Sequence, residues 1–173
     1  MFSKESVCKP NKKALAVANY FLYKNSLDQK ELTNKKLQKL LYYSQAWSLA
    51  LNNKKIFPDK IEAWVHGPAV PSVYFVFKDF GFETISKPAD RRLISCLTPE
   101  EKKLLDDIWL VYGKYPADYL EALSHSEKPW QTARERMENY EISDREIAPE
   151  IMKSYYVEKI KEQRKKARKS QKI

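Results

Sequence analysis

Glycine is scarce in this chain of 173 residues, which contains only three. So few glycines disfavour a fold made of many tight turns, and they disfavour a glycine-rich loop that cradles phosphate. No stretch reaches the roughly 18 consecutive apolar residues that a membrane-spanning helix needs. Residues 1–10 also lack the apolar core of a signal peptide. We therefore expect a cytoplasmic protein that has no membrane partner.

Cysteine is equally scarce. Cys8 and Cys96 do not have the density of a secreted disulfide scaffold, so we expect two reduced thiols. The two histidines, His66 and His125, form neither an HExxH motif nor a zinc-finger spacing with these cysteines. The sequence therefore predicts that no metal is bound and that both thiols are dispensable.

Catalytic motifs are missing as well. The chain has no GxSxG, no Walker loop and no GxGxxG. Asp106 and Asp107 are neighbours on an expected helix and diverge by roughly 100°, so they cannot form an acid/base pair. Cys96 lies in an apolar run, whereas a catalytic thiolate needs an exposed electropositive niche. These absences predict a binding protein without a cofactor rather than an enzyme.

Apolar residues are plentiful and recur at helical spacing along most of the chain. Hydrophobic residues make up 43% of the sequence, which is enough for a packed core. Thr33 suits the start of one expected helix. A capping box opens another, with Thr98 as the cap, Pro99 at the first position and Glu101 completing the box. The expected helices cover residues 10–24, 33–52, 71–81, 98–113 and a segment after Pro116.

The remaining segments predict a small strand element. Residues 61–66 are expected to be extended and to end at Gly67 and Pro68, and residues 82–97 show no clear helix. Ser143 and Glu146 have the spacing of a second capping box. The predicted class is mainly α, or α+β with a small strand element. We expect a compact multi-helix single domain with a basic C-terminal helical tail.

Positive charge is concentrated near the C-terminus. Residues 158–173 contain eight Lys and Arg against two Glu, a net charge of +6, whereas the other 157 residues are nearly balanced at +3. We therefore divide the chain into a helical domain, residues 1–157, and a basic tail, residues 158–173. We assign any contact with nucleic acid or an acidic partner to the tail. The alternative is that the tail only keeps the protein soluble. The candidate residues are Lys161, Arg164, Lys165, Lys166, Arg168 and Lys169.

Three ordered sequence blocks resemble a known family. They are LTNKKLQKLLYYSQAW at residues 32–47, IEAWVHGPAVPSVY at residues 61–74 and LSHSEKPWQTAR at residues 123–134. Together they resemble the Panacea domain family, also described as GepA-like or SocA-like phage-associated proteins. The resemblance covers about residues 10–157.

The resemblance implies a mainly helical antitoxin that neutralises a cognate protein toxin by direct binding, with the toxin encoded next to it. One branch of the family delivers its toxin to a bacterial AAA+ protease, so a proteolytic adaptor is one alternative. A DNA-binding regulator acting through the basic tail is another. The family supplies no catalytic residues.

The three blocks also supply the candidate residues for partner contact. Tyrosine and tryptophan are enriched in interface hot spots, and this chain has eleven and four of them. Trp64 is better suited to the core than to a contact, and His66 is expected to be exposed at the Gly67 corner. His125 is placed either as a contact or as a cap before the following proline. The candidates are Lys39, Tyr43, Trp64, His66, Gly67, Pro68, His125 and Trp130.

Overall fold

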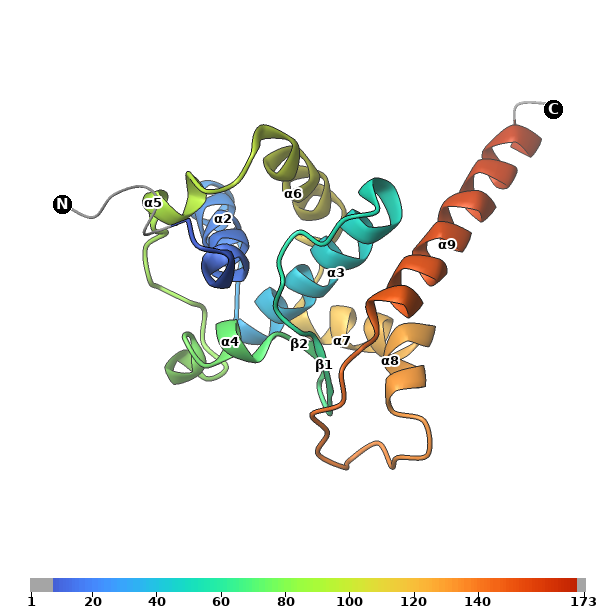
Figure 1. The fold of residues 1–173 in the computed structure, drawn as a ribbon. Helices are drawn as coiled ribbons and strands as arrows, with labels where there is room; N and C mark the ends of the chain where they lie inside the picture. The colour runs from blue at the N-terminus through green and yellow to red at the C-terminus, as the bar shows by residue number, and fades with distance from the viewer. Residues whose placement is uncertain (1–7, 171–173) are drawn as a thin grey trace.

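The protein is built mainly of helices, as a computed structural model that describes residues 8–170 shows (Figure 1). The predicted class, mainly α with a small strand element, is confirmed. In chain order the elements are η1 (Pro10–Lys12), α2 (Lys13–Asp28), α3 (Asn34–Asn52), β1 (Glu62–Trp64), β2 (Gly67–Ala69), α4 (Pro71–Tyr74), η2 (Lys78–Phe80), α5 (Arg91–Ile94), α6 (Pro99–Tyr112), α7 (Ala117–His125), α8 (Lys128–Ala133) and α9 (Pro149–Ser170).

Helix α3 lies at the centre of the fold. It is buried on nearly every side, and after its first two turns it is largely apolar; α2, α6, α7, α9 and β2 all contact it. In Figure 1 it runs between the α2–α6 side of the molecule and the long α9. Thr33 caps it as predicted, since Oγ1 accepts a hydrogen bond from Lys36 N at 3.2 Å. The capping box of Thr98 and Glu101 at the start of α6 is confirmed too.

Two short strands form a hairpin beside α3. β1 pairs antiparallel with β2, and the chain turns between them at residues 65–66. Gly67 and Pro68, which the sequence predicts as the end of the extended segment, therefore belong to a second strand. The φ angle of 92° at Gly67 permits this turn, because glycine has no Cβ to oppose a positive φ. The register is Glu62↔Ala69, Ala63↔Pro68 and Trp64↔Gly67.

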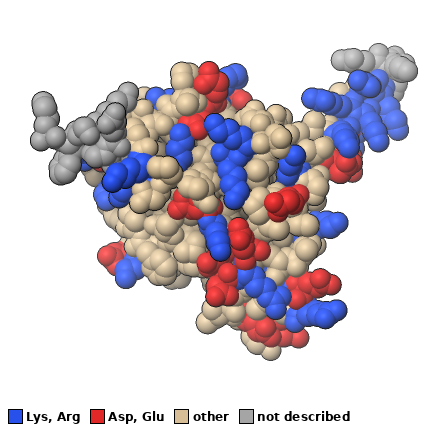
Figure 2. Space-filling view, viewed as in Figure 1, with Lys and Arg blue, Asp and Glu red and all other residues tan. Residues whose placement is uncertain are grey.

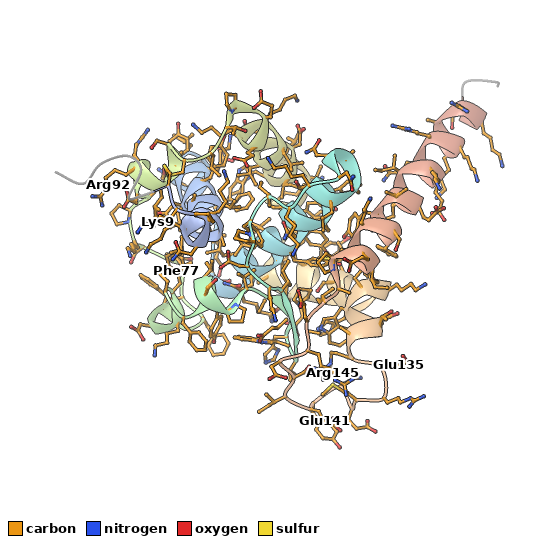
Figure 3. All side chains as sticks on the ribbon, in the orientation of Figure 1. Lys9, Phe77, Arg92, Glu135, Glu141 and Arg145 are labelled. Carbon is orange, nitrogen blue, oxygen red and sulfur yellow. A yellow bond between two sulfur atoms is a disulfide. The ribbon has the colours of Figure 1, made fainter. Side chains whose placement is uncertain are left out.

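The segment between α8 and α9 runs along the outer edge of β1. Ala63 N donates to Arg145 O at 2.8 Å, and Ile147 N donates to Ile61 O at 2.8 Å. Figure 3 shows Arg145 in this segment, below the helices. The capping box predicted at Ser143 is wrong, because Ser143 Oγ accepts from Arg145 N at 3.1 Å inside the extended segment. A serine hydroxyl can satisfy a local turn as well as a helix end.

Two further helix predictions need correction. Residues 82–97 contain the short helix α5, which Asp90 caps by accepting a hydrogen bond from Arg92 N at 2.9 Å. Helix α4 ends at Tyr74 and does not continue to Gly81, since its β-branched and aromatic residues are weak helix formers. Both α4 and α5 are single helical turns, one beginning at a proline and the other at a capping aspartate. Side-chain periodicity cannot detect so short a helix.

Helix α9 crosses the predicted domain boundary at residue 158 without a break. Met152 and Tyr156 in its first half are buried, whereas every side chain from residue 161 to residue 170 is exposed. Its outer half projects away from the other helices, and lysine and arginine gather on it (Figure 2). Exposure therefore changes after Ile160, three residues later than the boundary predicted from charge.

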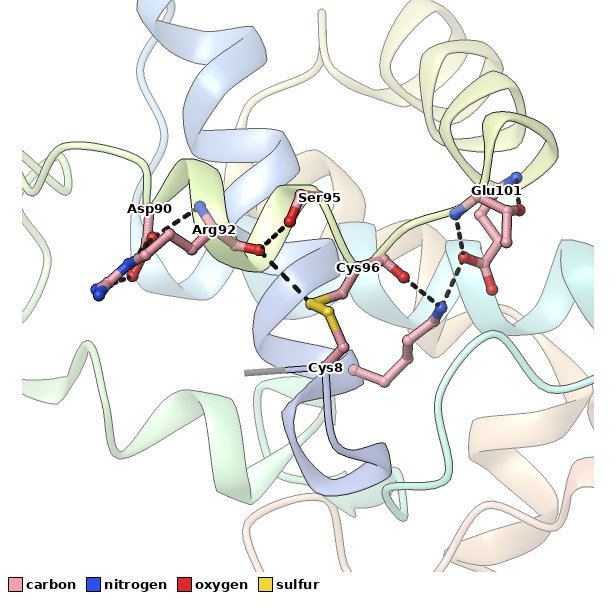
Figure 4. Close-up of a disulfide and its surroundings, with 8 residues drawn as sticks. Cys8, Asp90, Arg92, Ser95, Cys96 and Glu101 are labelled. Atoms are coloured by element: carbon pink, nitrogen blue, oxygen red, sulfur yellow. Dashed lines mark hydrogen bonds and ion pairs between the residues drawn. A yellow bond between two sulfur atoms is a disulfide. The ribbon is translucent and has the colours of Figure 1, made fainter. Parts of the chain in front are cut away.

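A disulfide joins Cys8 to Cys96, with their Cα atoms 5.1 Å apart (Figure 4). The expectation of two reduced thiols is therefore wrong in this structure. The fold places the segment before η1 against the end of α5, and a separation of 88 residues conceals this proximity in the sequence. Nearby, Lys13 Nζ donates to Cys96 O at 3.0 Å and to Glu101 Oε2 at 2.7 Å.

Candidate partner-binding site

The three sequence blocks meet at the hairpin. Lys39 Nζ, from α3, donates to Pro68 O at 3.0 Å. Trp130 Nε1, from α8, donates to Trp64 O at 3.0 Å. The first and third blocks thus hold the main chain of the hairpin, which is the second block, in place. Residues from α3 and α8 therefore position the side chains that the hairpin presents.

At Gly67 the hairpin lies against the side chains of Lys39 from α3 and Ser124 from α7. A Cβ atom at this position would lie 2.7 Å from Lys39 Cε and 2.9 Å from Ser124 Oγ. Both distances are shorter than the normal contact between a Cβ and a non-bonded atom, and φ at Gly67 is 92°. Glycine is favoured here by its backbone angle, and a larger residue would also have to displace the end of the Lys39 side chain.

Lys39 is a buried lysine, only 2% exposed. Burial lowers the pKa of its ammonium group to about 7, although the negative charge of Glu121 acts in the opposite direction. Near neutral pH the side chain is therefore a mixture of charged and neutral forms. Its role in the structure is to lock the hairpin onto α3 through Pro68 O.

Glu127 is the second buried charge of the junction, with 1% of its surface exposed. Its carboxylate accepts hydrogen bonds from Tyr42 OH at 3.0 Å and Tyr156 OH at 2.8 Å, and it pairs with Lys159 Nζ at 3.0 Å. Burial and the Glu127 charge raise the pKa of Tyr42 well above its usual value, so the hydroxyl stays protonated and donates. Glu127 thereby ties α3 and α9 to the start of α8.

An open hollow of about 500 Å³ lies between the hairpin and the start of α3. Its wall is largely apolar and aromatic, and two of its residues are unusually exposed: Phe82 at 91% and Ile142 at 94%. The lining residues are Asn34, Lys35, Gln38, Lys39, Trp64, Val65, His66, Gly67, Ala69, Tyr74, Gly81, Phe82, Ile142 and Ser143.

A charged cluster borders this hollow. His66 Nδ1 lies 3.1 Å from Glu121 Oε1, and Lys35 pairs with both Glu121 and Asp118. Burial acts to raise the pKa of Glu121, but hydrogen bonds from Lys35 and His66 hold it below its ordinary value. Glu121 is therefore a carboxylate, and it fixes the position of the exposed His66 side chain.

The structure places the candidate contact residues at different depths. His66 is exposed, as predicted, with 76% of its side chain accessible. Trp64 is half-buried, and so is His125, which stacks on Trp130 with ring centroids 3.9 Å apart. Tyr43 is fully buried and stacks on Tyr112 of α6 at 4.0 Å, so it lies in the core. Four further candidates are also buried: Lys39, Gly67, Pro68 and Trp130.

Sequence reasoning missed the residues that give the site its surface. Phe82 and Ile142 lie in loops without periodicity, so no pattern marked them as exposed apolar positions. Glu127 was within the third block, but its two tyrosine partners are far away along the chain. The tail candidates, from Lys161 to Lys169, are all exposed on α9.

The described residues contain neither a metal-binding cluster nor a membrane-spanning helix. Across residues 8–170, no group of three or more His, Cys, Asp or Glu side chains is arranged to hold a metal ion. No helix in this described part of the chain has the length and hydrophobicity to cross a membrane.

Comparisons with known proteins identify the family. Residues 37–131 match the family model described as antitoxin SocA-like, Panacea domain. The chain is 32% identical over 127 residues to antitoxin SocA of Caulobacter vibrioides (strain NA1000 / CB15N), and the match covers 68% of each chain. No solved structure matches it. By both measures the chain belongs to the SocA-like antitoxin family, whose members share the Panacea domain.

Proposed function

We propose that this protein is an antitoxin that neutralises a cognate protein toxin by direct binding at the hollow beside the hairpin. One observation carries the proposal: residues 37–131, which match the family, supply the hairpin and most of the hollow's lining. The buried groups Lys39, Gly67 and Trp130 hold this surface rigid from below. A site whose geometry is fixed in advance binds with little ordering cost, which favours tight binding.

The exposed apolar residues support binding rather than catalysis. Phe82 and Ile142 expose most of their side chains to water, and such side chains beside a hollow are typical of protein contact sites. A specific complex should bury about 1,200 Å² or more in total. The hollow with its charged border would form only the centre of such an interface.

The test is co-expression with the gene that lies next to this one. We expect growth to be rescued from the neighbour's toxicity and the two proteins to co-purify in a fixed ratio, with the toxin intact. Rescue by trace amounts that leave a covalent change on the toxin would contradict the proposal. Because a reducing compartment would open the disulfide between Cys8 and Cys96, the complex should be measured with and without reductant.

Two other modes are distinguished by the same system. A proteolytic adaptor would rescue growth only in a host with the AAA+ protease, and the toxin would disappear. A DNA-binding regulator is favoured by one observation, the six exposed basic residues at positions 161–169 of α9. Binding to duplex DNA that falls steeply with salt, and that is lost when residues 161–173 are removed, would support this role.

A further inference from the structure

A second hollow adjoins the first at the start of α3. Its volume is about 630 Å³, and Lys35 and Phe82 line both hollows. The two hollows are therefore neighbours on either side of these residues, and we call them together the α3 groove. The second half is lined by Lys30, Glu31, Thr33, Lys35, Lys36, Phe82, Gly113, Lys114, Tyr115, Pro116, Ala117 and Asp118.

The first half of the α3 groove is aromatic. The Trp64 ring meets the Tyr74 ring edge-on, with centroids 4.8 Å apart, and Phe82 stands at the junction of the two halves. Ile142 faces the same hollow from the loop before α9. An apolar side chain inserted here would bury its own surface together with that of Phe82 and Ile142, which gives it the character of a hot-spot anchor.

The second half carries surplus positive charge. Four lysines line it against two carboxylates, Glu31 and Asp118, and Lys35 already pairs with Asp118. Lys36 Nζ donates to Gly113 O at 2.8 Å, and Lys114 lies over the Tyr115 ring. Within residues 8–170 neither Lys36 nor Lys114 pairs with a carboxylate. Lys36 is buried, whereas Lys114 is exposed, so a carboxylate brought by a partner would pair with Lys114.

We infer that the α3 groove binds one segment of the toxin in which a large apolar side chain lies close to an acidic one. The apolar side chain enters the hollow walled by Trp64 and Phe82, and the carboxylate pairs with the exposed Lys114. This inference rests on the proposed function, because it identifies the chemistry of the toxin segment that the antitoxin recognises.

The experiment compares two groove variants with two matched controls, using the protein encoded by the adjacent gene as the probe. Phe82→Ala removes the apolar wall, and Lys114→Glu reverses the charge of the basic half. The controls are Leu51→Ala, which removes another exposed apolar side chain, and Lys55→Glu, which reverses another exposed lysine. Both lie at the opposite end of α3, and neither lines the groove. All four side chains are exposed, so each variant should fold, as circular dichroism and thermal melting would verify.

We expect each groove variant to bind the toxin about tenfold more weakly or worse, and each control to stay within about twofold of wild type. A photo-crosslinking residue at position 82 should label a toxin segment that contains an apolar residue and an Asp or Glu. Changing that acidic residue of the toxin to Lys should restore binding to the Lys114→Glu variant.

The outcomes separate the inference from the proposed function. If the wild-type protein does not bind or neutralise the toxin, both fail together. If wild type binds but either groove variant binds equally well, the inference fails and the proposed function stands. A cross-linked segment without an acidic residue also overturns the inference.

Discussion

The two halves of α9 share one helical backbone but have opposite environments. In the inner half Tyr156 and Lys159 bind the buried Glu127. In the outer half, residues 161–170, every side chain is exposed, and Lys161 pairs only with Glu158 on the same helix at 2.7 Å. Removing a charge destabilises the fold strongly when its partner is buried away from water, and weakly when both partners are exposed to solvent. Charge density alone therefore does not show where α9 stops packing on the other helices.

Of the substitutions that test this contrast, Glu127→Ala should have the largest effect on stability. The substitution leaves Lys159 and two tyrosine hydroxyls without their buried acceptor, and we expect a loss of about 3–5 kcal/mol in the free energy of unfolding. The measurement is urea denaturation. The control is Glu158→Ala, which removes an exposed partner and should leave the unfolding midpoint unchanged. Equal effects of the two substitutions would remove the distinction between the halves.

Two glycines with positive φ allow a second comparison, between a backbone position surrounded by side chains, Gly67, and one that faces open space, Gly81. Gly67→Ala places a Cβ 2.7 Å from Lys39 Cε, whereas a Cβ at Gly81 meets nothing within 4 Å. We expect Gly67→Ala to destabilise the protein by about 2–3 kcal/mol, and Gly81→Ala by about 1 kcal/mol from backbone strain alone. Thermal melting of the two variants measures the difference. An equal loss at both positions would show that the Lys39 contact gives way easily.

Lys39 tests what burial does to a single charge as pH changes. Its pKa is lowered to about 7 in the folded protein, while an unfolded lysine stays near 10.4. Between these values the unfolded chain binds a proton that the folded protein lacks, so the Lys39 contribution to stability rises with pH. Between pH 7 and pH 8 we expect the free energy of unfolding of wild type, relative to that of Lys39→Met, to rise by about 1 kcal/mol.

Denaturation at several pH values between 7 and 9 measures this gain. The exposed Lys165→Met variant is the control, and its stability should follow wild type across the range. A difference between wild type and Lys39→Met that stays constant with pH would show that the buried lysine does not titrate there.

The smallest effect should come from removing the exposed part of the tail. Deletion of residues 161–173 removes no side chain with a partner outside α9 in the described chain, so stability should change by less than about 0.5 kcal/mol. Deletion from residue 158 also removes Lys159 and leaves Glu127 without its cation, so this longer deletion should destabilise the protein clearly. Association with the toxin should slow most at low salt in both, if the tail steers the encounter. Matched melting curves for the two deletions would contradict the boundary after Ile160.

Features encoded within a few residues were predictable from the sequence. The caps at Thr33 and Thr98 depend on a hydroxyl and an amide three residues away, and both are found where the sequence predicts them. Short turns were harder, because a four-residue helix such as α5 contains too little periodicity to detect. Long-range pairs were not predictable at all, since Cys8 and Cys96, or Glu127 and Lys159, meet only after the helices have packed.

The same division applies to the candidate site. The family blocks indicated the hairpin and the residues beneath it, including Lys39 and Gly67, yet these turned out to be mostly supports rather than surface. The exposed residues Phe82 and Ile142 come from irregular loops, where neither helical nor strand spacing gives a signal. A motif thus revealed the framework of the site, and only the fold revealed the face that it presents.

The hairpin also determines how a partner can approach. Its outward-facing main-chain groups are already paired: Ala63 N with Arg145 O, Ala63 O with Arg134 Nη1, and Pro68 O with Lys39 Nζ, while Pro68 has no N–H to offer. A peptide that docks by β-augmentation needs an unpaired sheet edge whose ladder it can extend. This hairpin offers no such edge, so under the proposed function a toxin that docks here would be recognised through side chains. Sequence changes at the surface of the site could then alter which toxin is bound without disturbing the backbone beneath.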